Sequence, residues 1–466
     1  MTLKTELYAH QIAAVEKLSK IKIGALYMEM GTGKTRTALE LIAQRLNAGK
    51  ADHVIWLCPF SVKESLRREL LKHTDDISDI TIVGIESLSS SIRENVRLLE
   101  LAEEKRCFLV VDESNLVKNH RTKRTSNIIR LAGKCPYRLI LNGTPISRNE
   151  VDLFAQWLVL DWRVLGYRSF WSFAANHVEW DDRIPGRISA ALNTGYLVKK
   201  IAPYSYQIKK SECLDLPSKT YTIEYIGMTS RQWDHYQSVA DRLLFEVDEI
   251  KPESIYRLFS SLQSVISGFR VFIDRHITRE PFFEFPEDNP RVRDFLEVAD
   301  RISEKAVVFC KYTQEIRDLV EVLNEKHGEG TAVAFYGRLS QKERQENIEK
   351  FQNGARFFVA NKACAGYGLN LQFANYVIFY SNDWDYATRM QAEDRIHRMG
   401  QEKNVHIIDM CASQSLDERI LKCLYKKENM VDSFKRNLEH QKDKKEYLSN
   451  WINMKGDVVD AEAVRN

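Results

Sequence analysis

Two motifs, far apart in the sequence, combine residue types that suit the binding of a triphosphate. The first, Met30–Thr35, reads MGTGKT, and the second, Gln391–Gln401, reads QAEDRIHRMGQ. In the first motif, glycines let backbone N–H groups surround a phosphate, Lys34 would reach the β- and γ-phosphates, and the Thr35 hydroxyl would bind Mg²⁺. We therefore predict that ATP and Mg²⁺ bind at Gly31, Thr32, Gly33, Lys34 and Thr35. A chance glycine-rich turn is the alternative, since Met28 stands where the full pattern has a small residue.

Three residues of the second motif are spaced so that a helix would bring them together. Gln391, Arg395 and Arg398 follow one another at steps of four and three residues. On a helix these steps put side chains on one face, from which both guanidinium groups could approach a γ-phosphate as an arginine finger does. A phosphate cradle and an arginine clamp separated by most of the chain predict two lobes that close on one nucleotide. Such an arrangement would couple hydrolysis to lobe movement.

Acidic residues follow a strongly apolar run at Val110–Glu113. A carboxylate at the carboxyl end of a parallel strand is well placed to hold Mg²⁺, which is the role we predict for Asp112. Glu113 could orient and deprotonate the attacking water. The alternative is an acidic helix cap. A second apolar run, which begins at Leu139, ends in a small polar turn that contains Thr144. Thr144 could relay the state of the nucleotide, or the segment could be an ordinary strand followed by a proline turn.

Upstream of the cradle, the amide of Gln11 could pair with adenine N6 and N7 and thereby select ATP, although a solvent-facing glutamine is the equal alternative. Other polar residues follow predicted strands in both halves of the chain. Hydroxyls, cations and exposed backbone N–H groups in such loops suit sequence-independent, salt-sensitive contacts with phosphodiesters, but each loop alone is more often only a turn. The residues that we predict to contact nucleic acid are Ser61, Lys63, Lys311, Thr313, Arg338 and Gly366.

The composition is that of an ordinary soluble protein. Its 466 residues are 44% hydrophobic and 29% charged, with a net charge of +3, so the total charge does not identify a partner. No apolar run approaches a membrane span and the amino terminus lacks the apolar core of a signal peptide. The eight cysteines contain no close pair, which favours reduced thiols in a cytoplasmic protein over disulfides or a zinc site.

Short apolar, β-branched runs alternate with helical patterns in two series, which predicts two α/β lobes with parallel sheets. Aromatic residues fill a helical stretch at about 147–193, where core packing is favoured over stacking on bases. A second helical stretch spans 230–268, and a proline-containing connection spans 280–290. The predicted strands are Ile23–Met28, Val54–Cys58, Ile80–Gly84, Cys107–Asp112, Tyr137–Asn142, Leu216–Ile223, Ala306–Cys310, Thr331–Tyr336, Phe357–Ala360, Tyr376–Tyr380 and Val405–Met410.

The order of MGTGKT, VVDES, LNGTPI, AGYGLNL and QAEDRIHRMGQ resembles the Swi/Snf-type DNA translocases of helicase superfamily two. The resemblance implies an α/β fold of two RecA-like parallel-sheet lobes in tandem, each with a helical insertion. It divides the chain into a first lobe at 1–225, a second helical protrusion and connection at 226–290, and a second lobe with a brace helix at 291–466. It implies hydrolysis of ATP stimulated by double-stranded DNA, with tracking along one strand that need not separate the strands.

The resemblance implies that Gln11 recognises adenine and that the roles given above fall to Lys34, Thr35, Asp112, Glu113, Arg395 and Arg398. From its place beside the two arginines, we also predict that Gln391 contacts the nucleotide. The chain departs from the family where Ser114 and Asn115 replace a small residue and a histidine. An asparagine amide could still hydrogen-bond toward Thr144, so we assign Asn115 to coupling. Flanking modules that read chromatin marks have no counterpart here, which suggests a bacterial or phage origin. The expected partners are double-stranded DNA and ATP, and a protein partner could supply specificity. A strand-separating DNA or RNA helicase and a nucleotide-gated DNA-binding scaffold without turnover remain as rivals.

Overall fold

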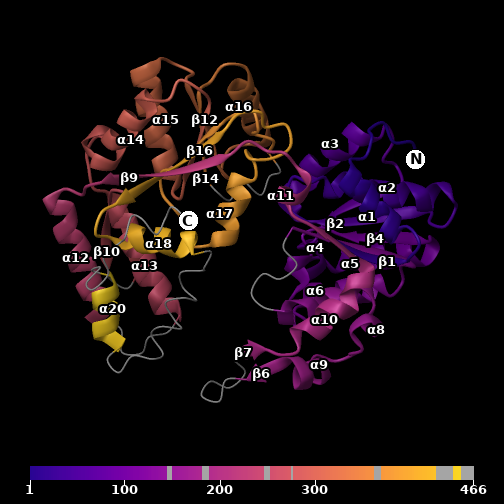
Figure 1. Cartoon of the computed structure of the whole chain (residues 1–466). Helices are drawn as coiled ribbons and strands as arrows, with labels where there is room; N and C mark the ends of the chain where they lie inside the picture. Colours follow the sequence, from indigo (N-terminus) through magenta and orange to yellow (C-terminus); the bar gives the residue numbers. More distant parts are fainter. Residues whose placement is uncertain are drawn as a thin grey trace. The chain divides into compact units, whose positions relative to one another are not determined.

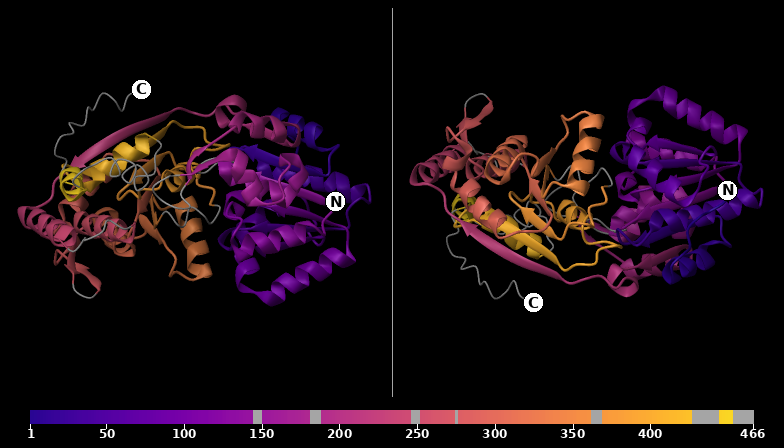
Figure 2. Two further views of the ribbon diagram at one scale, coloured as in Figure 1. Left: turned by 90° about the horizontal axis from the view of Figure 1, so that it is seen from below. Right: turned by 90° about the horizontal axis from the view of Figure 1, so that it is seen from above.

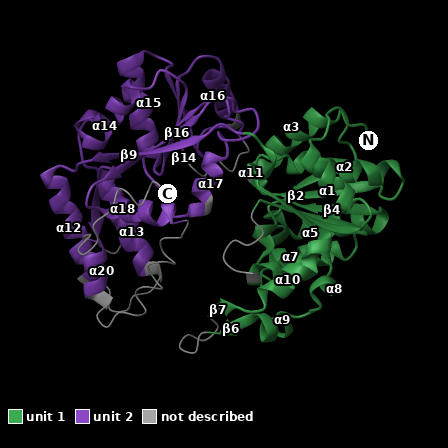
Figure 3. Ribbon diagram, in the orientation of Figure 1, with its two compact units in different colours: residues 1–215 green, residues 216–466 purple. Residues whose placement is uncertain are grey.

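The structure is a computed structural model, and it describes residues 1–143, 150–180, 188–245, 252–273, 276–361, 369–426 and 444–452. The chain divides into two compact units, Met1–Asp215 and Leu216–Asn466 (Figure 3). Each unit is built around a six-stranded sheet in which all neighbouring strands are parallel. The predicted α/β class with two parallel-sheet lobes is confirmed.

The sheet of unit 1 has the strand order β3-β2-β4-β5-β1-β8. Figure 1 labels β1, β2 and β4 of this sheet. Successive side chains of a strand point to opposite faces of the sheet, so a strand buried on both faces needs a continuous apolar run. In β1, Ala25 and Tyr27 belong to one core cluster, whereas Leu26 and Met28 belong to another. The strands are β1 (Ile23–Met28), β2 (His53–Cys58), β3 (Ile80–Gly84), β4 (Cys107–Val111), β5 (Tyr137–Asn142) and β8 (Ser205–Ile208).

Helices cover both faces of this sheet (Figure 2). One face packs against α1 (Ala9–Leu18), α2 (Lys34–Asn47) and α3 (Lys63–His73). The other packs against α5 (Ile92–Glu104), α6 (Lys123–Ala132) and α7 (Leu153–Leu160). The remaining helices of unit 1 are α4 (Ser87–Ser90), α8 (Trp162–Leu165), α9 (Phe170–His177), α10 (Thr194–Ile201) and α11 (Lys210–Cys213).

The aromatic stretch forms α7, α8 and α9, followed by a hairpin of β6 (Val178–Trp180) and β7 (Ile188–Ala191). Trp157 and Phe173 are fully buried, so core packing rather than base stacking is confirmed for them. Trp171 differs, because 66% of it is exposed. The hairpin was not predicted, since its strands are short and only partly buried.

The sheet of unit 2 has the order β13-β14-β12-β15-β16-β9. Along β12, Val307 and Phe309 face one core cluster, and Ala306, Val308 and Cys310 face another. The strands are β9 (Lys219–Ile226), β12 (Ala306–Cys310), β13 (Ala332–Phe335), β14 (Phe357–Asn361), β15 (Tyr376–Phe379) and β16 (Val405–Ala412), and a separate antiparallel pair is β10 (Phe269–Ile273) with β11 (Ile277–Pro281).

The two faces of the second sheet are covered unequally. Helices α16 (Gln341–Asn353) and α17 (Tyr386–Glu393) contribute to the smaller cluster. The larger cluster includes α12 (Ser230–Phe245) and α13 (Pro252–Ile266), which confirms the predicted helical stretch at 230–268. Its other helices are α14 (Pro290–Asp300), α15 (Thr313–His327), α18 (Leu416–Tyr425) and α20 (Lys444–Ile452).

The boundary between the units lies after Asp215, earlier than the predicted end of the first lobe at residue 225. The reason is β9, which pairs along its whole length with β16 of unit 2. Helices α12 and α13 likewise belong to unit 2 rather than to a separate segment. Among the residues that the structure describes, no helix has the length and apolar character needed to span a membrane.

Candidate functional site

The loop between β1 and α2 has the backbone conformation that the cradle motif predicts. Gly31 and Gly33 have φ angles of 84° and 87°, a region that side chains with a Cβ avoid. Helix α2 begins at Lys34, directly after Gly33. Because the first N–H groups of a helix lack an intrahelical acceptor, they are available for an anion at this loop. The local geometry therefore suits a phosphate.

Lys34 lies where three adjacent strands end. Its ammonium donates a hydrogen bond of 2.8 Å to the Met28 carbonyl at the end of β1. A Cβ on Gly143, which follows β5, would stand 3.7 Å from the Lys34 Nζ. Strand β5 lies between β1 and β4, so the ammonium is held at the carboxyl edge of this part of the sheet. Ligands of open parallel sheets bind outside that edge.

Gln11 is buried behind the cradle, with 1% of its surface exposed, which contradicts the solvent-facing alternative. Its Nε2 donates to the Thr32 carbonyl at 3.1 Å, and its Oε1 accepts from the Tyr8 N–H at 3.0 Å. The ring of His10 also contacts the Thr32 carbonyl, at 2.8 Å. These contacts hold the loop from inside. Adenine recognition by Gln11, which stays a prediction, would require this amide to exchange partners.

Asp112 and Glu113 follow β4 at the same edge of the sheet. Burial, together with the negative charge of Glu113, raises the pKa of Asp112 to about 7, while the positive charge of Lys34 lowers it. The Glu113 backbone has a φ of 52°, in a region that non-glycine residues rarely adopt, and its N–H donates to Asp112 Oδ1 at 3.0 Å. Strained residues gather at functional sites. Lys34 and the two carboxylates thus meet at one edge of unit 1.

Asn115 follows the carboxylates in a short helical turn. Its Oδ1 is buried and has no hydrogen-bond partner among the described residues. The neighbouring Ser114 donates to Gln156 Oε1 at 2.7 Å and is held by that contact. Thr144, the predicted partner of Asn115, lies outside the described residues, and so does Gly366. Coupling by these residues stays a prediction.

The prediction that one helix face carries Gln391, Arg395 and Arg398 is wrong. Helix α17 ends at Glu393, so Gln391 is helical while the two arginines lie in the turns that follow. After Glu393 the hydrogen bonds no longer follow one helical pattern: the Ile396 N–H donates to the Glu393 carbonyl at 3.1 Å, and the Arg395 carbonyl accepts from the sequence-distant Leu371 N–H at 3.0 Å. The Arg398 guanidinium donates to the Asn370 side chain.

A buried ionic network, which the sequence analysis did not identify, lies beside this turn. Glu393 accepts from Arg389 Nε at 2.8 Å, from Lys219 Nζ at 2.9 Å and from the Tyr221 hydroxyl at 3.0 Å. Arg389 also donates to Asp409, on β16, at 3.0 Å. Because Lys219 and Glu393 are 174 residues apart, no local pattern reveals the pair. The only sequence signal was the position of Glu393 inside QAEDRIHRMGQ.

The residues predicted to contact nucleic acid have different surroundings. Lys63 and Thr313 are the first residues of α3 and α15, and Arg338 is exposed in a turn after β13. Ser61 lies in the short helical turn Phe60–Val62. Lys311 is largely enclosed: its ammonium lies 3.8 Å from the centre of the Trp384 ring and contacts the Gln263 side chain. Burial lowers the pKa of Lys311, so this lysine is poorly placed for a surface phosphate.

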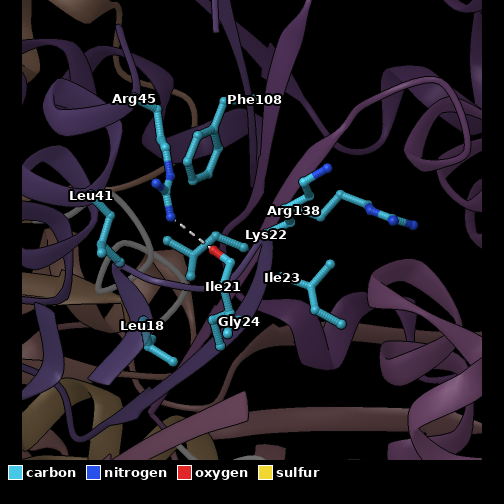
Figure 4. A pocket seen from close by; sticks show the side chains of 10 residues that line it. Leu18, Ile21, Lys22, Ile23, Gly24, Leu41, Arg45, Phe108 and Arg138 are labelled. Carbon is cyan, nitrogen blue, oxygen red and sulfur yellow. Dashed lines mark hydrogen bonds between the residues drawn. The ribbon is translucent and has the colours of Figure 1, made fainter. Parts of the chain in front are cut away.

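One small pocket lies at the opposite edge of the first sheet (Figure 4). It is lined by Ile23 at the start of β1, by Arg138 near the start of β5 and by Arg45 near the end of α2. Arg45 donates to the Ile21 carbonyl at 3.0 Å. A volume of about 10 Å³ holds roughly one water molecule. This hollow is too small for a nucleotide and lies away from the cradle.

Three families match consecutive parts of the chain. The type III restriction enzyme, res subunit, matches residues 4–75, the SNF2-related domain matches 78–267, and the helicase conserved C-terminal domain matches 290–400. Together they include the glycine loop Met30–Thr35, the carboxylates Asp112 and Glu113, and the residues after α17 that carry Arg395 and Arg398, which we call the arginine turn. The chain belongs to the SNF2-type helicase family.

Relatives of this SNF2-type chain occur in bacteria and eukaryotes. An uncharacterized ATP-dependent helicase of Mycoplasma pneumoniae is 25% identical over 88% of the chain and 40% of the relative. The ISWI chromatin-remodeling complex ATPase ISW2 of Saccharomyces cerevisiae is also 25% identical, over 85% of the chain and 38% of the relative. The chain thus spans about two fifths of the length of these relatives. A solved Sulfolobus solfataricus SWI2/SNF2 ATPase core in complex with dsDNA is similar with a TM-score of 0.43 and 24% identity, over 97% of this chain and 98% of that one.

Proposed function

We propose that this SNF2-type chain hydrolyses ATP when it binds double-stranded DNA and uses the hydrolysis to track along the phosphate backbone. The observation that carries the proposal is the meeting of Lys34, Asp112 and Glu113 at adjacent strand ends of unit 1. The lysine and the glycine loop suit a phosphate. Of the two neighbouring carboxylates, one could bind a divalent cation and the other could accept a proton. The names of the relatives, which include ATP-dependent helicases and a chromatin-remodeling ATPase, agree with this chemistry.

In this proposal the cradle N–H groups and Lys34 bind the β- and γ-phosphates. Glu113 orients the attacking water and accepts its proton. The oxygen atoms of Thr35 and Asp112 suit Mg²⁺, which usually takes one or two protein oxygens and completes its shell with phosphate oxygens and water. The raised pKa of Asp112 fits such a cation, because a nearby positive charge would favour the ionised carboxylate. When bound, Mg²⁺ would neutralise charge that develops on the phosphates.

Arg395 and Arg398 belong to unit 2, and we propose that they donate to the γ-phosphate while it is transferred. Guanidinium groups are suited to this role because they offer several N–H donors in a fixed plane. Both units would contact the phosphate backbone of the nucleic acid, and Lys63 and Arg338 are candidates for these contacts. Contacts of this kind release counterions, so binding should weaken steeply as salt rises. A protein partner could add specificity.

Phosphate release tests the proposal when it is measured without nucleic acid and with duplex DNA, single-stranded DNA, forked DNA and RNA at fixed salt. We expect duplex DNA to stimulate the wild-type protein most. Lys34→Ala and Glu113→Gln should each reduce the stimulated rate by about a hundredfold or more, since each removes a group that acts on the transition state. Lys50→Ala, at an exposed lysine after α2, is the matched control.

Turnover that persists in both site variants would contradict the assignment. A wild-type protein that binds duplex DNA without hydrolysing ATP would identify the scaffold instead. Displacement of a triplex strand without unwinding of a duplex would support tracking, whereas unwinding of the forked substrate would identify a strand-separating helicase.

A further inference from the structure

The turn that carries Arg395 is built on the last residue of α17. The carbonyl of Glu393 accepts hydrogen bonds from the N–H groups of Ile396, at 3.1 Å, and His397, at 2.9 Å. On its other side, the Arg395 carbonyl is held by Leu371. The direction in which the arginine turn leaves the helix therefore depends on how firmly Glu393 is held.

The side chain of Glu393 is fixed more firmly than a single helix end requires. Only 2% of it is exposed, and it receives hydrogen bonds from Arg389, Lys219 and Tyr221. Burial alone would raise the pKa of Glu393, but the charges of Arg389 and Lys219 hold it below its ordinary value. The carboxylate is consequently ionised and linked to two cations. Such charge-assisted bonds are short and directional.

Two of these partners come from the strand that begins unit 2. Lys219 and Tyr221 are two residues apart on β9, so they point to the same face of the sheet. The His397 ring contacts the Pro217 carbonyl at 2.8 Å. Since unit 2 begins at Leu216, the chain that leaves unit 1 enters unit 2 through residues that hold the arginine turn.

We propose that Lys219 and Tyr221 are positioning residues for Arg395 and Arg398, through which the connecting chain orients the arginine turn. This inference rests on the proposed function, in which those arginines approach the γ-phosphate. Arg389 already shares its charge with Asp409. Of the two cations beside Glu393, the loss of Lys219 would leave Arg389, which is shared with Asp409. The arginine turn would then lose its fixed orientation.

Steady-state ATP hydrolysis with saturating duplex DNA tests the proposal in Lys219→Met, Lys219→Arg and Tyr221→Phe. We expect Lys219→Met to lower kcat about tenfold to a hundredfold, since misplaced catalytic groups cost this much. The KM for ATP should stay within about twofold, because the cradle that binds ATP is in unit 1. Lys219→Arg should restore most of kcat, and Tyr221→Phe, which removes one hydroxyl, should lower it by about threefold.

Lys326→Met is the matched control, because Lys326 forms an ion pair of 2.6 Å with Asp300 on the surface of the same unit. A merely structural role for Lys219 would lower the melting temperature and leave kcat of the folded enzyme unchanged. An unchanged kcat in folded Lys219→Met, or an equal loss in Lys326→Met, would overturn the proposal.

Hydrogen exchange separates a failure of this inference from a failure of the proposed function. If the wild-type protein hydrolyses no ATP, the proposed function fails, but the positioning role can still be measured. Amides of residues 394–398 should then exchange at least about tenfold faster in Lys219→Met than in Lys326→Met, because their anchor is released. Equal exchange in the two variants would overturn the positioning role whatever the activity.

Discussion

The two units differ in how they compensate buried charge near their sheets. In unit 1, Asp112 lies beside the like charge of Glu113, and its pKa is raised to about 7. In unit 2, Arg389 and Lys219 meet Glu393 and Asp409, so that cations and carboxylates balance. The first arrangement leaves negative charge for a cation to neutralise, and the second is already complete.

This contrast agrees with different tasks for the two sites. A site that binds a charged ligand gains from groups that the ligand itself will satisfy, although the empty protein is less stable for it. A segment that must present two arginines in one orientation gains from a network whose members are all satisfied. We therefore expect neutral substitutions at Asp112 and at Arg389 to change stability in opposite directions.

The largest effect should come from breaking the complete network. Arg389→Met leaves the buried Glu393 with Lys219 as its remaining cation and removes from the buried Asp409 the guanidinium that it contacts. Removal of one partner from a buried ion pair costs about 3–5 kcal/mol in the free energy of unfolding. Urea unfolding, followed by hydrogen exchange of unit 2 peptides, measures this loss. The exposed-pair control Lys326→Met should cost less than about 1 kcal/mol. Equal losses in both variants would mean that the buried network is not special.

An opposite effect is expected in unit 1 from Asp112→Asn. Between the ordinary aspartate pKa of 3.8 and the folded value of about 7, the folded state binds the proton more strongly, so wild-type stability falls as pH rises. The charges that act on Asp112 are those of Glu113 and Glu69, which raise its pKa, and Lys34, which lowers it. The variant removes this titration, so its gain in unfolding free energy over the wild type should be about 2 kcal/mol larger at pH 8 than at pH 5.

Thermal unfolding at both pH values measures this gain, and Asp75→Asn, in an exposed pair with Lys4, is the control that should change little. A gain that is the same at pH 5 and pH 8 would show that Asp112 does not carry the uncompensated charge.

The smallest effect concerns the cradle itself. Gly33→Ala places a Cβ 2.1 Å from Gln11 Nε2 at a φ of 87°, whereas Gly49→Ala, at a φ of 61°, meets nothing within 4 Å. Both variants lose stability because alanine disfavours the left-handed backbone conformation, but only Gly33→Ala displaces Gln11 from the Thr32 carbonyl. Gly33→Ala should therefore lose about 1 kcal/mol more in unfolding free energy than Gly49→Ala. In the Gly33→Ala variant, the further substitution Gln11→Ala should lower the free energy of unfolding only a little. If the losses of the two single substitutions add, displacement of Gln11 is not the cause of the loss in Gly33→Ala.

Continuous apolar runs were enough to predict most of the two sheets, and β12 has the predicted bounds. Strand β8 was missed because its four residues, SYQI, contain no such run and pair with β1 only through tertiary structure. The hairpin of β10 and β11 was also missed, since β11 (ITREP) contains no apolar run and both strands carry charged, exposed residues.

The candidate site shows the same division between local and distant information. The spacing within Met30–Thr35 was enough to predict the loop, because its glycine conformations depend on residues that are adjacent in the sequence. Spacing within Gln391–Gln401 predicted a longer helix, but the helix ends at Glu393, and beyond it the Arg395 carbonyl accepts a hydrogen bond from Leu371, which is distant in sequence. The bond from Lys219 to Glu393 joins strands and helices that are distant in sequence, so only the folded chain reveals it.

We propose that Lys34, which belongs to unit 1, and Arg395 and Arg398, which belong to unit 2, act on one triphosphate. The most direct test compares ATP binding with DNA-stimulated hydrolysis in the double variant Arg395→Ala and Arg398→Ala. We predict a dissociation constant for ATP near that of the wild type and a stimulated rate about a thousandfold lower, as expected for the loss of an arginine finger. A stimulated rate within about twofold of the wild type would contradict the claim, because an arginine clamp should change the rate far more than this.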